Sequence, residues 1–83
     1  MISKMDIKCK IIEALNNVGI LVGVEDFDMI DLREYDMDSI MFVSFVVDLE
    51  EIFGISIPDE YLSLDCLANL NFVLSMIEER NNL

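Results

Sequence analysis

Residues 38–54 read Asp38-Ser39-Ile40-Met41-Phe42-Val43-Ser44-Phe45-Val46-Val47-Asp48-Leu49-Glu50-Glu51-Ile52-Phe53-Gly54. We predict one helix here, over residues 39–53. Asp38 is a good N-cap, because its carboxylate can accept hydrogen bonds from the free N–H groups of the first turn. Gly54 suits the left-handed position that ends many helices. The helix is unusually apolar, since Ser44 is the one polar residue between Ile40 and Val47.

Two apolar stripes run along this predicted helix. At about 100° per residue, the first stripe should face the core, and it contains Phe42, Phe45, Val46, Leu49 and Phe53. The second stripe, Ile40, Val43 and Val47, lies well away from the first. Between them we expect Ser44, Asp48 and Glu51 to contact water. The helix therefore has a second apolar face that the core does not need.

The flanking segments predict two further main helices. Over residues 4–18 one amphipathic stripe contains Ile7, Ile11, Ala14, Leu15 and Val18. Gly19 follows this stripe as a natural stop. A last helix is expected over about residues 69–79, with Asn69 as N-cap. Its inward residues are predicted to be Leu70, Val73, Leu74 and Ile77.

Two connections join these helices. Residues 19–38 predict a long, ordered acidic loop whose apolar residues are covered, namely Ile20, Leu21, Val22, Phe27, Ile30 and Leu32. Residues 55–58 should be extended, because the residue before Pro58 avoids the α region. A short irregular segment or one-turn helix is expected over residues 59–66. The predicted fold is all-α, a small four-helix bundle of three main helices and one short helix, in a single domain over residues 1–83.

The charge of the chain restricts its partners. The 83 residues include 17 acidic and 5 basic side chains, for a net charge of −12. Such a surface repels nucleic acids and anionic membranes and favours partners with basic patches. Charges interrupt every apolar segment, and Asp6 and Glu13 fall where a signal peptide needs apolar residues. We therefore expect a cytoplasmic monomer that binds neither nucleic acid nor membrane.

The cysteines and the acidic loop do not predict a metal site. Cys9 and Cys66 lack metal-ligand spacing, so we interpret them as small, partly buried apolar residues without a disulfide. A calcium loop starting at Asp26 needs glycine at its sixth position, where this chain has Asp31. We expect no bound metal and a solvated acidic loop.

The chain contains no histidine. A Ser-His-Asp arrangement is therefore impossible within this subunit, and the usual general base near neutral pH is missing. Asp38 does not activate Ser39, because an ionised aspartate is too weak a base for a hydroxyl group. We predict a protein without catalytic residues of its own.

Ser39 supports two interpretations. A helix N-terminus presents unpaired N–H groups and the positive end of the helix dipole, which together suit a phosphate ester. In one interpretation Ser39 carries a phosphodiester-linked group. In the other, Ser39 rather than Asp38 caps the helix, and the local sequence taken alone favours this second interpretation.

Three segments follow one another along the chain: Asp38-Ser39-Ile40, then Leu49-Glu50-Glu51-Ile52-Phe53-Gly54-Ile55, then Ile57-Pro58-Asp59-Glu60. In this order and spacing they resemble the acyl carrier protein family, including its peptidyl carrier relatives. The resemblance continues at Asn69-Leu70 and from Leu74 to Ile77, so it spans nearly the whole chain. Two departures stand out. Asp36 replaces the glycine usual before the Asp-Ser step, and Met41 and Ser44 replace acids that are usual in fatty-acid carriers.

The resemblance implies that Ser39 receives 4′-phosphopantetheine from coenzyme A through a separate phosphopantetheinyl transferase, with Asp38 orienting the helix start. The thiol of the arm would carry an acyl or aminoacyl group as a thioester between enzymes of fatty acid, polyketide or nonribosomal peptide-type synthesis. Implied partners are the transferase, a loading ligase and downstream synthase enzymes with basic or apolar docking patches. We expect partners to contact Ile40, Met41, Val43, Val47, Glu50 and Glu51.

The uncharged start of the helix favours a stand-alone carrier of a specialised or nonribosomal-type pathway. The main alternative is an unmodified helical interaction module that binds a partner through Ile40, Val43 and Val47. A third possibility, an inactive carrier-like scaffold, has the same sequence signature.

Overall fold

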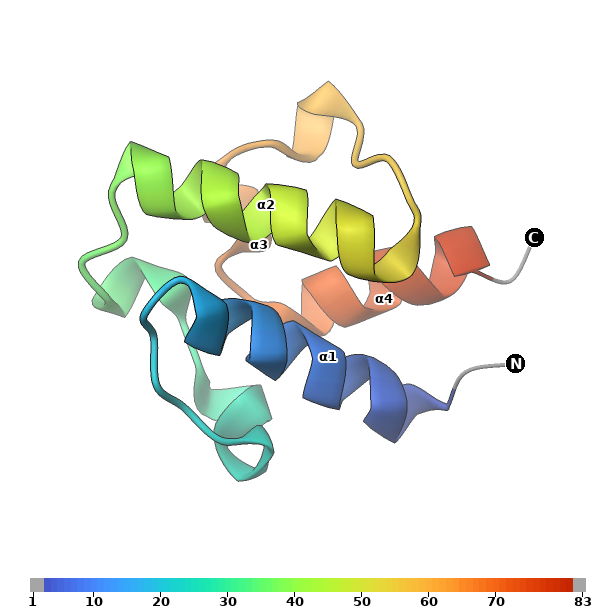
Figure 1. Cartoon of the computed structure of the whole chain (residues 1–83), viewed down its shortest axis with the longest axis horizontal. Coiled ribbons are helices and arrows are strands. Elements are labelled where there is room, and N and C mark those ends of the chain that lie inside the picture. The colour runs from blue at the N-terminus through green and yellow to red at the C-terminus, as the bar shows by residue number, and fades with distance from the viewer. Residues whose placement is uncertain (1–2, 82–83) are drawn as a thin grey trace.

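A computed structural model describes residues 3–81 of the chain, and within this range it contains helices and connecting segments but no strand. The predicted all-α fold is confirmed. The elements in chain order are α1 (Lys4–Asn17), η1 (Val24–Met29), η2 (Leu32–Glu34), α2 (Ser39–Phe53), η3 (Asp59–Tyr61), α3 (Leu64–Leu67) and α4 (Leu70–Asn81). Three long helices and the one-turn helix α3 form the bundle, and the three η elements are 3₁₀ helices in its connections (Figure 1).

Side-chain caps and left-handed glycines set the ends of the two longest helices. The Ser3 hydroxyl accepts a hydrogen bond of 3.1 Å from the Asp6 N–H at the start of α1. Gly19 has φ of 98° just beyond α1, and Gly54 has φ of 64° just beyond α2. These backbone angles favour glycine because a Cβ atom is disfavoured there. Both predicted helix ends are therefore confirmed.

The core lies where α1 packs against α2 and α4 (Figure 1). The predicted inward stripes of α1 and α4 are confirmed, apart from Val18, which is half-buried at the end of α1. On α2 the buried side chains are Phe45, Val46 and Leu49, whereas Phe42 and Phe53 pack against the core at its edge. The buried side chains at the centre of the bundle are Ile7, Ile11, Leu15, Phe27, Leu32, Phe45, Leu49, Leu67, Leu70, Val73 and Ile77.

The long connection between α1 and α2 contains the two 3₁₀ helices η1 and η2, which the sequence pattern did not predict. Ile20, Phe27, Ile30 and Leu32 are buried as expected. Leu21 is 83% exposed, so the prediction that it would be covered is wrong. Residues 20–23 belong to no helix or strand, so the burial of Ile20 does not require that the next side chain be buried, and that of Leu21 lies in solvent.

The segment after α2 returns across the bundle to α4. Residues 55–58 belong to no helix or strand, and the expected short helical region divides into η3 and α3. Asn69 Oδ1 accepts a hydrogen bond of 2.8 Å from the Asn71 N–H, which confirms Asn69 as the N-terminal cap of α4. α4 itself ends at Asn81, two residues beyond the predicted end.

Both cysteine thiols are free in the structure. Cys66 is half-buried, but Cys9 is exposed because it lies off the inward stripe of α1, so its predicted partial burial is wrong. In the part of the chain that the structure describes, no helix is both long and apolar enough to cross a membrane.

Candidate functional site

The site is built around the start of α2. Asp38 has extended backbone angles, and its Oδ1 accepts a hydrogen bond of 2.8 Å from the Met41 N–H. The Asp38 carbonyl also accepts the first helical bond, from the Phe42 N–H at 2.9 Å. Asp38 is thus the N-cap of α2. The interpretation in which Ser39 caps the helix is wrong.

Ser39 is the first residue of α2, and its side chain is exposed. The N–H groups of the first turn have no acceptor within the helix. The Asp38 carboxylate accepts from the Met41 N–H. The N–H groups of Ser39 and Ile40 remain without an acceptor from the helix, next to the Ser39 hydroxyl. Together with the positive end of the helix dipole, these groups favour a negatively charged substituent at this position.

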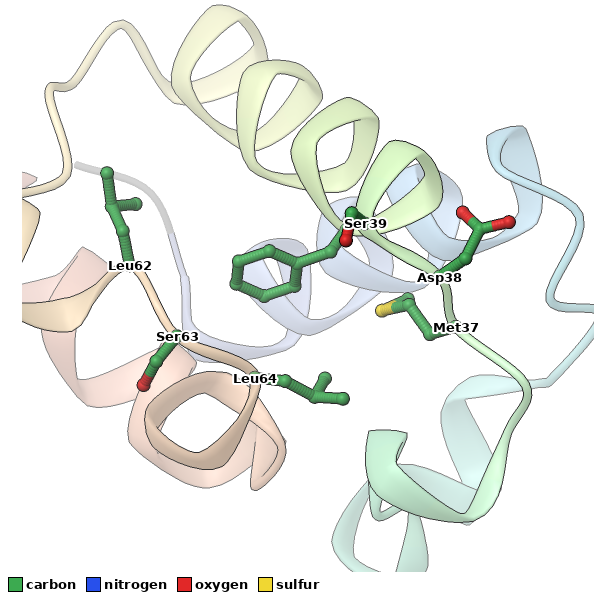
Figure 2. Close-up of a pocket in the computed structure, with 7 residues that line it drawn as sticks. Met37, Asp38, Ser39, Leu62, Ser63 and Leu64 are labelled. Atoms are coloured by element: carbon green, nitrogen blue, oxygen red, sulfur yellow. The ribbon is translucent and has the colours of Figure 1, made fainter.

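A hollow of about 290 Å³ opens beside Ser39, and we call it the start hollow. Met37, Asp38, Ser39 and Phe42 line one side of it, and residues Leu62 to Leu64 line the other. Figure 2 shows Ser39 at the first turn of α2, facing across this space toward the Leu62–Leu64 segment. A group attached to Ser39 therefore has both open solvent and a partly apolar hollow within reach.

A second hollow, of about 330 Å³, lies further along α2 and is called here the far hollow. Its lining residues are Phe42, Val43, Val46, Val47, Glu50 and Leu62. The second apolar stripe is exposed, as the helical pattern predicted: Ile40 is 77% exposed, Val43 58% and Val47 42%. This stripe therefore borders both the solvent and the far hollow.

The other three candidate partner-binding residues differ in their surroundings. Met41 is half-buried and packs against the core. The half-buried Glu50 lines the far hollow, and its Oε2 accepts a hydrogen bond of 2.9 Å from the Ile57 N–H. Glu51 is exposed on the surface of α2. Met41 and Glu50 thus make contacts within the fold, whereas the side chain of Glu51 is exposed to a partner.

Leu62 lines both hollows and is 40% exposed, but the sequence pattern did not single it out. It lies between η3 and α3, in a segment without helical periodicity. The available signal was its position just after the turn that follows Pro58, which indicates a connection but not the direction of the side chain.

One side of the start hollow is tied to the long loop. Leu32 N–H donates a hydrogen bond of 3.1 Å to the Ala68 carbonyl, and Asp31 pairs with Asn69 in an isolated backbone bridge. Arg33 binds Asp31 through two side-chain hydrogen bonds of 3.0 and 2.8 Å, and its Nη1 lies 3.8 Å from Asp65 Oδ1 in α3. The loop therefore holds α3 in place beside the hollow.

The Arg33 ion pair changes the titration of both partners. Hydrogen bonds from the Arg33 side chain, and then from its backbone N–H, lower the pKa of Asp31 below its ordinary value of 3.8. The same side-chain hydrogen bond raises the pKa of Arg33. Both groups are exposed, so the pair is a weak surface contact rather than a catalytic one.

The residues at Ser39 fit a phosphodiester-linked arm. The hydroxyl is exposed, unpaired N–H groups lie beside it, and the start hollow adjoins it. Metal chemistry has no comparable set of ligands, because residues 3–81 contain no group of three acidic or cysteine side chains placed to hold an ion. The site can therefore bear a covalent group.

Comparison with known proteins supports this conclusion. A family described as "phosphopantetheine attachment site" matches residues 11–70, well over half of the chain. Searches of curated proteins and of solved structures found no match. The matched range includes all of α2 and both hollows, and it confirms the resemblance found in the sequence motifs. The chain belongs to the phosphopantetheine-attachment family, which includes the acyl carrier proteins and whose cofactor is covalently bound 4′-phosphopantetheine.

Proposed function

We propose that Ser39 is the residue that bears the 4′-phosphopantetheine, within a single carrier domain. The observation that carries this proposal is that the residue which caps α2 is not the residue which presents the exposed hydroxyl. Asp38 supplies the cap, while the Ser39 hydroxyl stays exposed beside unpaired N–H groups. A separate phosphopantetheinyl transferase would join the Ser39 oxygen, which loses its proton, to the diphosphate phosphorus of coenzyme A that bears the pantetheine. The P–O–P bond of the diphosphate would break, and adenosine 3′,5′-bisphosphate would leave.

The arm, once attached, supplies a terminal thiol that holds an acyl or aminoacyl group as a thioester. The residues of this chain hold and present the arm. The dipole of α2 favours the phosphate, and the cap fixes the first turn. We propose that the protein has no catalytic activity of its own and shuttles its cargo between enzymes of fatty acid, polyketide or nonribosomal peptide-type synthesis.

Partner enzymes are proposed to dock on the exposed face of α2. Ile40, Val43 and Val47 form its apolar centre, with Met41 at its edge and the acids Glu50 and Glu51 beyond. The first half of α2 carries no charge, so docking there depends on apolar contact, with basic patches meeting the acids around it. This arrangement favours a specialised or nonribosomal-type pathway.

The test is the intact mass of the protein after incubation with coenzyme A and a promiscuous phosphopantetheinyl transferase. We expect the wild type to gain one phosphopantetheine and Ser39→Ala to gain none. Ser44→Ala is the matched control, since Ser44 is exposed on the same helix, and it should be modified like the wild type. An adduct on Ser39→Ala would contradict the assignment.

Two alternatives give different results in this experiment. An unmodified interaction module that binds through Ile40, Val43 and Val47 would show no adduct on the wild type. An inactive carrier-like scaffold would accept the arm in the test tube but carry none when isolated from its native cells.

A further inference from the structure

One buried side chain holds the segment that carries Ser39. Within the described part of the chain, Met37 is the one buried residue between Leu32 and Phe45, and it is 8% exposed. Its neighbours on both sides are exposed, as is Ser39. Met37 belongs to the core and also lines the start hollow (Figure 2). Ser39 therefore lies two residues from the point at which its segment enters the core.

The backbone before Met37 forms a tight turn. The Met37 N–H donates a hydrogen bond of 2.6 Å to the Tyr35 carbonyl, so Asp36 is the central residue of a γ-turn. Within residues 3–81 no residue other than glycine has a positive φ, so this is the common inverse form of the turn. Asp36 thus makes the turn without the glycine that is usual before the Asp-Ser step. The turn leads directly into the buried Met37.

Met37 directly precedes the cap of α2. An apolar residue at this position often fixes the angle at which the chain enters a helix, by packing near the fourth helical residue. Phe42 is that fourth residue, and it lines the start hollow together with Met37. The next residue, Asp38, accepts from the Met41 N–H at 2.8 Å. Loss of the Met37 side chain would therefore free both the cap and the first turn.

Ser39 needs a fixed position because its oxygen must approach the phosphorus of coenzyme A in one direction. Misplacing a reacting group by about 1 Å can lower a rate about a hundredfold. Resting on the proposed function, we propose that Met37 is a positioning residue for attachment of the arm. Its burial holds the first turn of α2, and with it the Ser39 oxygen, in the orientation that the transferase uses. Met37 contacts no reacting atom and acts through the helix start.

The experiment measures single-turnover transfer from coenzyme A, with the transferase in excess over the carrier. Met37→Ala should lower the saturating rate constant about tenfold, because the serine is less well placed. The transferase concentration at half-saturation should stay within about twofold of wild type, since the exposed face of α2 is unchanged. Met37→Leu keeps a buried apolar side chain of similar volume and should restore the rate.

Met76→Ala is the matched control. Met76 is a buried methionine of α4, 4% exposed, and it lines neither of the two hollows. Both alanine variants should lose stability, so rates are compared at a temperature at which each is folded. Met76→Ala should then transfer the arm at the wild-type rate. Hydrogen exchange of the Met41 amide, whose acceptor is Asp38, should be faster in Met37→Ala than in Met76→Ala.

The possible failures are distinguishable. A wild-type rate for Met37→Ala, or an equal loss in Met76→Ala, would overturn the positioning role. A higher half-saturating concentration with an unchanged rate constant would do the same, since Met37 would then act in docking. If Met37→Ala does not fold, Met37→Val replaces it, with a smaller loss expected and the same contradicting outcomes. The absence of an adduct on the wild type, seen by intact mass, would instead overturn the proposed function and this inference with it.

Discussion

Helices α1 and α2 have nearly the same length and the same kind of ends, but they use their apolar residues differently. Each begins at a side-chain cap, Ser3 or Asp38, and each is followed by a left-handed glycine. In α1, Ile7, Ile11, Ile12, Ala14 and Leu15 are all buried. In α2, Phe45, Val46 and Leu49 are buried, while Ile40, Val43 and Val47 are exposed. α2 thus carries apolar side chains beyond those that the bundle buries.

The largest expected effect is on stability, and it tests whether the two faces of α2 really differ. Phe45→Ala should lower the free energy of unfolding by about 3–5 kcal/mol, because it leaves a cavity in the core. Val43→Ala should change it by no more than about 0.5 kcal/mol, since the side chain is 58% exposed. Urea unfolding of both variants measures the difference, and similar losses would show that the second stripe is part of the core.

A charge on the exposed stripe should affect partner enzymes rather than folding. Val43→Asp is expected to leave the unfolding free energy within about 1 kcal/mol of wild type. It should slow arm transfer or downstream acyl transfer about tenfold, because a charge would be placed in an apolar contact. Ser44→Asp adds the same charge one residue away, off the stripe, and should be much less harmful. Equal rates for Val43→Asp and wild type would argue against docking at this stripe.

These two predictions rest on a distinction that the sequence already made. The helical period separated the two stripes of α2, and it also identified the inward faces of α1 and α4. The cap at Asn69 and the glycine ends followed from local backbone chemistry, whereas the local sequence favoured Ser39 over Asp38 as the cap of α2 and was wrong there. Within helices, a fixed angle per residue relates position in the chain to direction in space, so these features were predictable.

The remaining features depend on contacts between segments far apart in the chain. Buried Met37 and Met76 were not predicted, and exposed Leu21 was wrongly expected to be covered. Leu62 gains its place beside both hollows through the path of an irregular segment. Glu50 was predicted to contact partners, but the sequence did not show that the returning chain brings the Ile57 N–H to its carboxylate. No local pattern encodes where such a segment returns.

The smallest expected effect lies in the loop that joins α1 to α2. The folded-state pKa of Asp31 is lowered by Arg33, so the pair contributes stability above the unfolded pKa of about 3.8, and this contribution is lost as the pH falls through the lower folded-state value. Arg33→Gln should remove this small dependence. The test is the difference between wild type and Arg33→Gln in urea midpoint, followed as the pH is lowered through this range. A constant difference would show that the ion pair does not contribute.

The backbone contact of residues 31–32 with residues 68–69 closes the chain into a ring that contains α2 and the Leu62–Leu64 wall of the start hollow. Separating α3 from the loop breaks the hydrogen bond from the Leu32 N–H to the Ala68 carbonyl. The hydrogen on that one amide nitrogen exchanges with solvent only when the ring opens. The hydrogen-exchange rate of the Leu32 amide therefore measures how often the ring opens, at a position remote from Ser39.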